Sequence, residues 1–178
     1  MADARSTQRG MFLHSGSLMA QRDGPPRYEV QLPSQPAPAA QPDPTAYASL
    51  LPSVPAAELR ATVVPVSTKL EVGEKPAPLL LIHDRRRGDP WQQNQQATML
   101  TISLANGFGM EVFGPALVLF AEPGRDLSGS YYDTLDDLIQ NEVLGKFEDG
   151  EQPTEQDWRF WGEAFQLMLE DRAGETHD

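Results

Sequence analysis

Proline is concentrated in one part of this 178-residue chain: nine of the sixteen prolines lie between residues 25 and 55. Proline fixes φ and has no amide hydrogen to donate, so neither a helix interior nor a central strand is expected where it recurs. We therefore predict that residues 1–57 form a flexible, largely disordered Pro/Ala-rich leader. One compact domain is then expected at residues 58–173, with a short tail at 174–178.

Three segments after residue 57 have the composition of strands. Residues 61–72 are rich in β-branched side chains, residues 78–84 form a short continuous apolar run, and residues 110–121 are strongly hydrophobic. Residues 91–105 fit a helix, but the alternation within residues 99–104 also fits a strand.

Two amphipathic helices are expected next, at residues 133–147 and 153–172. Asp133 or Thr134 is a suitable N-cap for the first helix, and Thr154 with Asp157 resembles a capping box at the start of the second. The predicted fold class is α+β. A small sheet of three to four strands carries one central helix and two C-terminal acidic amphipathic helices, preceded by the disordered leader.

The apolar periodicity of these elements predicts the residues of the core. They are Val64, Leu80, Ile82, Leu100, Ile102, Val112, Leu117, Leu119, Leu138, Ile139, Trp158, Trp161 and Phe165.

The excess of negative charge is confined to the C-terminal third of the chain, because the acidic and basic residues of 1–120 are equal in number. Residues 121–178 contain sixteen acidic and four basic residues, so the whole net charge of −12 lies there. Acidic residues on the solvent faces of helices aid solubility, which is one explanation. The other is recognition, because a dense acidic surface steers and binds a basic partner.

Ten residues are the predicted partner-binding set on this acidic surface. Phe160 and Leu167 are included because they lie seven residues apart, on roughly the opposite side of their helix from Trp158, Trp161 and Phe165. The set is Asp136, Glu142, Glu148, Asp149, Glu155, Phe160, Glu163, Leu167, Glu170 and Asp171.

Three consecutive arginines, Arg85, Arg86 and Arg87, follow the strand expected at 78–84. Guanidinium groups match phosphate and carboxylate in shape and charge, so the run is a candidate anion-binding site. The alternative is a solvated loop whose arginines neutralise nearby acids.

Several classes of function have no support in the sequence. The chain has no cysteine, only three histidines, and no phosphate-binding loop or nucleophile motif. The pair Asp136-Asp137 could bind a metal or act in acid–base chemistry, but the dipole of a capped first helical turn also explains it. We therefore predict no catalytic residue, no metal and no cofactor. The acidic balance also argues against direct binding of nucleic acid or of an anionic membrane.

Eight positions between residues 84 and 118 resemble a small phage- and plasmid-borne domain family of unknown function. They are Asp84, Gly88, Asn94, Ala97, Thr98, Gly114, Pro115 and Val118, in the pattern N-x-x-A-T followed by G-P-x-x-V. The resemblance covers a fraction of the chain and implies a strand–turn–helix–strand unit in a mobile-element accessory protein. It brings no activity or catalytic residue. On this interpretation Asn94 caps a helix or forms a turn, and Ala97 and Thr98 pack that helix on the sheet.

The leading functional hypothesis is a non-enzymatic protein-interaction module that binds a basic protein partner through its acidic C-terminal helices. The alternative is a structural or assembly component of a larger particle, which would form homo-oligomers. The third is a small phosphate-ligand binder, or an enzyme, that uses Arg85, Arg86 and Arg87. The expected location is the cytoplasm of a host cell or a virion, without secretion.

Overall fold

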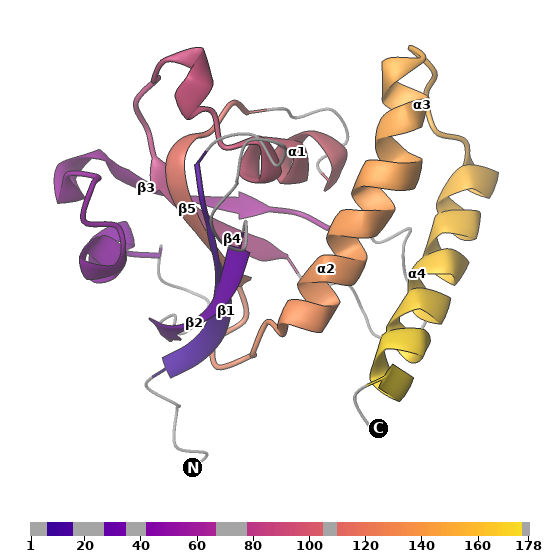
Figure 1. The fold of residues 1–178 in the computed structure, drawn as a ribbon, viewed down its shortest axis with the longest axis horizontal. Coiled ribbons are helices and arrows are strands. Elements are labelled where there is room, and N and C mark those ends of the chain that lie inside the picture. The colour runs from indigo at the N-terminus through magenta and orange to yellow at the C-terminus, as the bar shows by residue number, and fades with distance from the viewer. Residues whose placement is uncertain (1–6, 16–26, 35–41, 67–77, 105–109, 176–178) are drawn as a thin grey trace.

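The computed structural model describes residues 7–15, 27–34, 42–66, 78–104 and 110–175. Within these ranges the chain forms a five-stranded antiparallel sheet of order β2-β1-β5-β4-β3, with helices on one face (Figure 1). The strands are β1 (Thr7–Leu13), β2 (Arg27–Pro33), β3 (Leu59–Val64), β4 (Leu79–Asp84) and β5 (Phe113–Phe120). The helices are α1 (Gln95–Leu104), α2 (Gly129–Leu138), α3 (Leu144–Glu148) and α4 (Glu155–Glu175). A π-helical turn, Ile139–Val143, joins α2 to α3 without a break.

The prediction of a disordered leader before a sheet of three to four strands was wrong. β1 lies inside the sheet, paired with β2 on one side and β5 on the other, and both strands come from the first 57 residues. The prolines flank these strands instead of interrupting them. β1 precedes every proline, and Pro33 is the last residue of β2, where a missing donor does little harm.

The proline-rich residues after β2 also contribute to the fold. A 3₁₀-helix, η2 (Pro44–Leu50), begins with a proline at its first turn, a position that proline favours, and a second, η3 (Ala56–Glu58), leads into β3. Asp43 caps η2 by accepting a hydrogen bond from the Thr45 amide at 2.9 Å.

The sheet separates two hydrophobic cores, because side chains alternate along each strand. On β4, Leu79 and Leu81 face the core covered by α1, α2 and α4. Leu80 and Ile82 face the second core, which η2 and the residues after it cover with Tyr47, Leu51 and Val54. Twelve of the thirteen predicted core residues are buried, and the side chain of Ile102 lies outside the described residues.

The remaining element predictions were partly right. Residues 78–84 form β4 and most of 110–121 forms β5, while residues 67–72 of the strand expected at 61–72 lie outside the described residues. Within the region 91–105 the helix α1 runs from Gln95 to Leu104, the last residue described there. The helix expected at 133 begins earlier, at Gly129, because Ser128 is its N-cap and accepts a hydrogen bond from the Tyr131 amide at 3.1 Å.

Candidate functional site

α4 packs one side against α2 and leaves the opposite side at the surface (Figure 1). The capping box expected at its start is present: the Asp157 carboxylate accepts hydrogen bonds from the Thr154 amide at 2.8 Å and hydroxyl at 2.7 Å, and the Asp157 amide donates to the Thr154 hydroxyl. The inward side carries Trp158, Trp161 and Phe165, all buried. The rings of Trp158 and Trp161 meet edge-to-face with centroids 5.0 Å apart.

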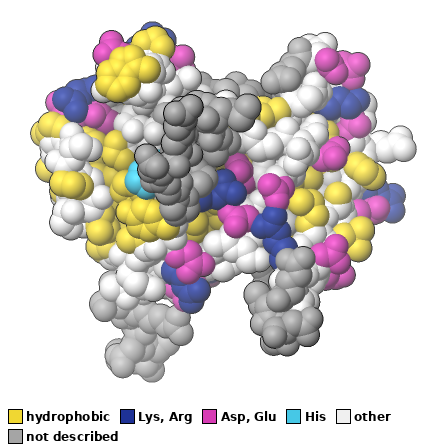
Figure 2. Space-filling model, viewed as in Figure 1, with side chains coloured by type: hydrophobic (Ala, Val, Ile, Leu, Met, Phe, Trp, Pro, Cys, Tyr) yellow, Lys and Arg dark blue, Asp and Glu magenta, His cyan; other side chains and the backbone are white. Residues whose placement is uncertain are grey.

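We call the opposite side the α4 outer face, defined by Glu155, Arg159, Phe160, Glu163, Leu167 and Glu170. Phe160 is 58% exposed and Leu167 is 62% exposed, although both are large hydrophobic residues. A shallow hollow of about 620 Å³ lies beside Phe160, bordered also by Glu155, Gln156, Arg159 and Glu163. Figure 2 shows acidic and hydrophobic side chains together on the side of the molecule formed by the C-terminal helices.

Most of the predicted partner-binding residues are at the surface, but they do not form one continuous element. Glu155, Glu163, Glu170 and Asp171 are exposed on α4, whereas Glu142 and Asp149 are exposed on the preceding π-turn and on the turn after α3. The side chain of Glu148 lies outside the described residues.

Asp136 is the exception, because its side chain is only 7% exposed. Arg27, from β2, forms an ion pair with Asp136 at 2.7 Å and a second ion pair with Asp133 at 2.7 Å. The same guanidinium donates to Gln96 at 3.2 Å and lies over the ring of Tyr132, 5.3 Å from its centroid. Asp136 is therefore held inside the protein and does not face a partner. The first-turn explanation of Asp136 was also wrong, because α2 begins seven residues earlier.

Burial and charge act against each other in this cluster. Burial raises the pKa of Asp136, and the nearby Arg27 guanidinium only partly offsets that effect. For Arg27, burial lowers the pKa, but the attraction of Asp136 and Asp133 outweighs burial and raises the pKa overall. Removing the arginine would leave a carboxylate that burial already disfavours.

Each of the three consecutive arginines pairs with a carboxylate. Arg85 donates to Glu58 at 2.6 Å, Arg86 donates through Nε and Nη2 to Asp84 at 2.7–3.1 Å, and Arg87 pairs with Glu111. For Asp84, burial raises the pKa, but the hydrogen bonds from Arg86 outweigh burial, and the pKa lies below its ordinary value. These pairs agree with the interpretation of the run as a loop that neutralises nearby acids, yet they do not use every arginine donor.

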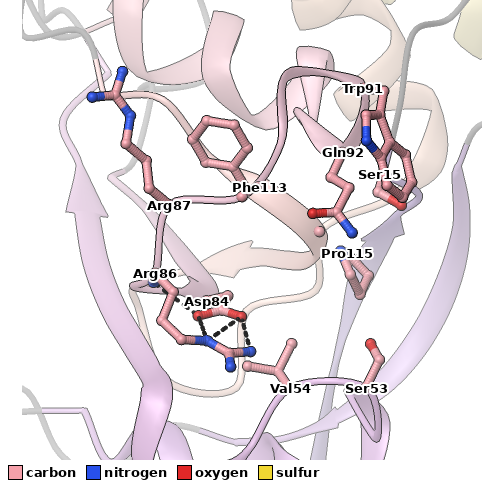
Figure 3. A pocket seen from close by; sticks show the side chains of 12 residues that line it. Ser15, Ser53, Val54, Asp84, Arg86, Arg87, Trp91, Gln92, Phe113 and Pro115 are labelled. Atoms are coloured by element: carbon pink, nitrogen blue, oxygen red, sulfur yellow. Dashed lines mark hydrogen bonds and ion pairs between the residues drawn. The ribbon is translucent and has the colours of Figure 1, made fainter.

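A cavity of about 450 Å³ lies beside this loop, at the end of the sheet where β4 ends and β5 begins. Arg86 and Arg87 line it, whereas Arg85 does not. In Figure 3, Arg86 lies at one end of the cavity beside Val54 and Ser53, and Trp91 lies at the other end beside Ser15. The guanidinium of Arg87 points away from the space between them.

The local sequence explains how the cavity is built. Asp84 ends β4, and a short 3₁₀ turn, η5 (Pro90–Gln92), projects Trp91, which is 74% exposed. Gly114 has a φ of 73°, a left-handed conformation that glycine adopts without steric cost, and no atom occupies the space beside it. Gly114 lines the cavity and contributes no side chain to fill it.

Asn94, Ala97 and Thr98 take the structural roles expected of them. The Asn94 carboxamide accepts a hydrogen bond from the Ala97 amide at 3.1 Å and donates to the Gly114 carbonyl at 2.9 Å, so it caps α1 and ties it to β5. Ala97 is fully buried in the core beneath α1, and Thr98 accepts a hydrogen bond from the Val112 amide.

Comparisons of the chain with protein-family models, with curated proteins and with solved structures find no match. The resemblance to a phage- and plasmid-borne family therefore stays a prediction from eight residues. No group of three or more acidic, histidine or cysteine side chains in the described ranges could hold a metal ion. Of the helices the structure describes, none is both long and apolar enough to cross a bilayer.

Proposed function

We propose that the protein is a non-enzymatic interaction module that binds a partner protein along the α4 outer face. One observation carries this proposal: Phe160 and Leu167 expose more than half of their surface on a helix whose other side is already packed. A helix that needs only one apolar side to join its domain gains no stability from exposing a phenylalanine and a leucine on the other. Exposed apolar side chains rimmed by charge are typical of protein interfaces.

The charge around these residues favours a basic partner. Arg159 and Glu163 form an ion pair at 3.3 Å, and Glu155 and Glu170 leave the α4 outer face with a net negative charge. A segment with apolar side chains two helical turns apart and basic side chains beside them matches this pattern. A second copy of the chain fits less well, because two α4 outer faces would bring acidic residues together.

The test compares variants of the full chain in a cross-linking pull-down from a cell lysate. Phe160→Gln combined with Leu167→Gln removes the apolar residues, and Glu163→Gln combined with Glu170→Gln removes the charge. Val63→Gln is the matched control, because Val63 is a 53% exposed hydrophobic residue on β3. Circular dichroism should first show the same helix content in all four proteins.

We expect one captured partner with a basic surface, retained by the Val63 variant and weakened by salt. The apolar double variant should reduce its capture about tenfold or more, because central apolar anchors dominate such interfaces. The charge double variant should reduce capture less and should weaken its dependence on salt. Capture that is equal in every variant would contradict the proposal. Self-association that depends on Phe160 and Leu167, measured by analytical ultracentrifugation, would instead favour the assembly role.

A further inference from the structure

We propose that the cavity between Arg86 and Trp91 binds a small planar aromatic molecule that carries one anionic group. This site is separate from the α4 outer face and does not depend on the function proposed there. The cavity volume of about 450 Å³ lies within the range of about 300–1,000 Å³ that small-molecule sites occupy.

The aromatic end of the cavity is Trp91. Its indole is 74% exposed, whereas Trp158 and Trp161 are 5% and 3% exposed. In Figure 3 the hydroxyl of Ser15 and the carboxamide of Gln92 lie next to the indole, and the ring of Pro115 lies below them on the same side of the cavity, so the flat indole is its aromatic wall. A ring placed against this wall would remove the indole from water and gain stacking energy.

The anionic end is Arg86. Its Nε and Nη2 are held by the two oxygens of Asp84, which fixes the plane of the guanidinium before any ligand arrives. Nη1 has no hydrogen-bond partner among the described residues, so it remains free to donate to a carboxylate or phosphate oxygen. The side chain is half exposed, at 50%, and an incoming anion can reach it.

The charge of the cavity suits a ligand with a single anionic group. Arg86 and Asp84 balance each other in its lining and the Arg87 guanidinium points away, so the free Arg86 donor is the group that would hold an anion, in a chain whose net charge is −12. A polynucleotide would present many phosphates to the acidic remainder of the protein, but a ligand with one anionic group would not. The flat wall and the single oriented guanidinium therefore select a small ligand that has both a ring and an anion.

The test is a nuclear magnetic resonance titration of the ¹⁵N-labelled full chain. The indole N–H signals report on the tryptophans, and the Nε–H signals report on the arginines. Benzoate represents aromatic acids and adenosine monophosphate represents nucleotides. Benzamide and adenosine are their neutral counterparts, and acetate and phosphate are the anions without a ring. We expect benzoate or the nucleotide to shift the Trp91 and Arg86 signals, with at least tenfold tighter binding than its neutral counterpart and its ringless anion.

Three variants connect binding to the proposed residues. Arg86→Gln should raise the dissociation constant about tenfold or more, because it removes a charge-assisted hydrogen bond. Arg85→Gln is the matched control and should leave binding unchanged, since Arg85 pairs with Glu58 and does not line the cavity. Trp91→Ala should also weaken binding, and this exposed side chain can be removed without disturbing the arginine loop.

Binding by benzoate would identify aromatic acids as the ligand class, and binding by the nucleotide alone would identify nucleotides. The proposal is overturned if neither ligand shifts the Trp91 signal. It is also overturned if benzamide and adenosine bind as well as the charged ligands, or if Arg85→Gln weakens binding as much as Arg86→Gln.

Discussion

Replacing Arg27 with methionine tests whether the N-terminal strands and the C-terminal helices form one folding unit. Arg27 lies on β2, and its ion pair with Asp136 on α2 joins residues 109 positions apart in the sequence. Methionine keeps the unbranched apolar stem of the side chain and removes the guanidinium with its charge. The change leaves Asp136, whose side chain is 7% exposed, with the Gln140 carboxamide at 3.5 Å as its one hydrogen-bond donor among the described residues.

The expected cost follows from the burial of each carboxylate. Breaking a buried ion pair by removing one partner costs about 3–5 kcal/mol, because an uncompensated charge stays inside the protein. Asp133, the other partner of Arg27, is 40% exposed, and water can replace its lost ion pair at a cost of about 1 kcal/mol or less. We therefore expect Arg27→Met to lower the free energy of unfolding by about 3–5 kcal/mol, measured by urea denaturation.

A second substitution separates the ion pair from the packing around it. Arg27→Met combined with Asp136→Leu replaces both charges with apolar groups, which is often neutral or stabilising in a protein interior. The double variant should be more stable than Arg27→Met alone. Arg172→Met is the matched control. Arg172 also pairs with acids of α2, but those acids, Asp133 and Asp137, are 40% and 42% exposed, so its loss should cost about 1 kcal/mol or less.

The pH dependence gives the same test an independent measurement. Burial raises the pKa of Asp136, so the carboxyl group binds its proton more tightly in the folded state than in the unfolded state. Stability therefore rises as the pH falls from the raised pKa toward the ordinary value of 3.8, because the buried carboxyl becomes neutral. Without Arg27 the pKa of Asp136 rises further, because the guanidinium no longer offsets burial. Arg27→Met therefore regains more stability than the wild type as Asp136 becomes protonated, and the stability difference between the two proteins should shrink at low pH. A cost equal to that of Arg172→Met, with no dependence on pH, would refute this reasoning.

Two further predictions concern the sheet and the second core. Gly10→Ala should lower the free energy of unfolding by about 1–3 kcal/mol in urea, because the added carbon would lie 2.4 Å from a Leu32 methyl carbon and 2.5 Å from the Val118 carbonyl oxygen. Gly145→Ala is the control and should not destabilise the protein, because the added carbon would meet no described residue within 4 Å outside its chain neighbours and its own helix backbone. Burial raises the pKa of Tyr47 to about 12, so the unfolded chain loses the phenolic proton of Tyr47 at lower pH than the folded protein does. Stability should therefore fall from pH 10 to 12 more steeply in the wild type than in Tyr47→Phe, as thermal unfolding would show.

Elements with a strong local signal could be predicted from the sequence. The apolar run of β4 identified a strand buried on both faces, and Thr154 with Asp157 identified the start of α4. The apolar spacing of Trp158, Trp161 and Phe165 gave the packed side of α4. In each case the evidence lies within one or two helical turns or one strand length, which is the range over which hydrophobic periodicity and capping act.

β1 and β2 were missed because their evidence is not local. Proline density averaged over residues 25–55 hides the proline-free stretch from Arg27 to Leu32, and β1 is stabilised by pairing with β5, more than one hundred positions away. The buried Gln8 shows the same dependence on distant residues, since its carboxamide donates to the Phe120 carbonyl at 2.9 Å. A polar residue next to the N-terminus gives no sign in the sequence that a distant strand will bury it.

Asp136 was misassigned for the same reason. On α2 it lies beside the apolar residues Leu135 and Leu138, and helical spacing alone places it toward solvent. The structure brings β2 against this side of the helix, and Arg27 pairs with the carboxylate there. Conversely, helical spacing placed Phe160 and Leu167 opposite the packed side of α4. The structure leaves them exposed because α4 packs mainly on one neighbour.

The positions of the two proposed sites determine how each can be tested. Because β1 and β2 pair within the sheet, a fragment that begins at residue 58 would lack two of its strands, and loss of binding by that fragment would report on folding. Exposed side chains avoid this difficulty. Phe160 and Leu167 project from α4, whereas Arg86 and Trp91 belong to the loop between β4 and α1. We expect substitutions at one site to leave the packing of the other site intact. A negative result at one site would therefore leave the proposal for the other site standing.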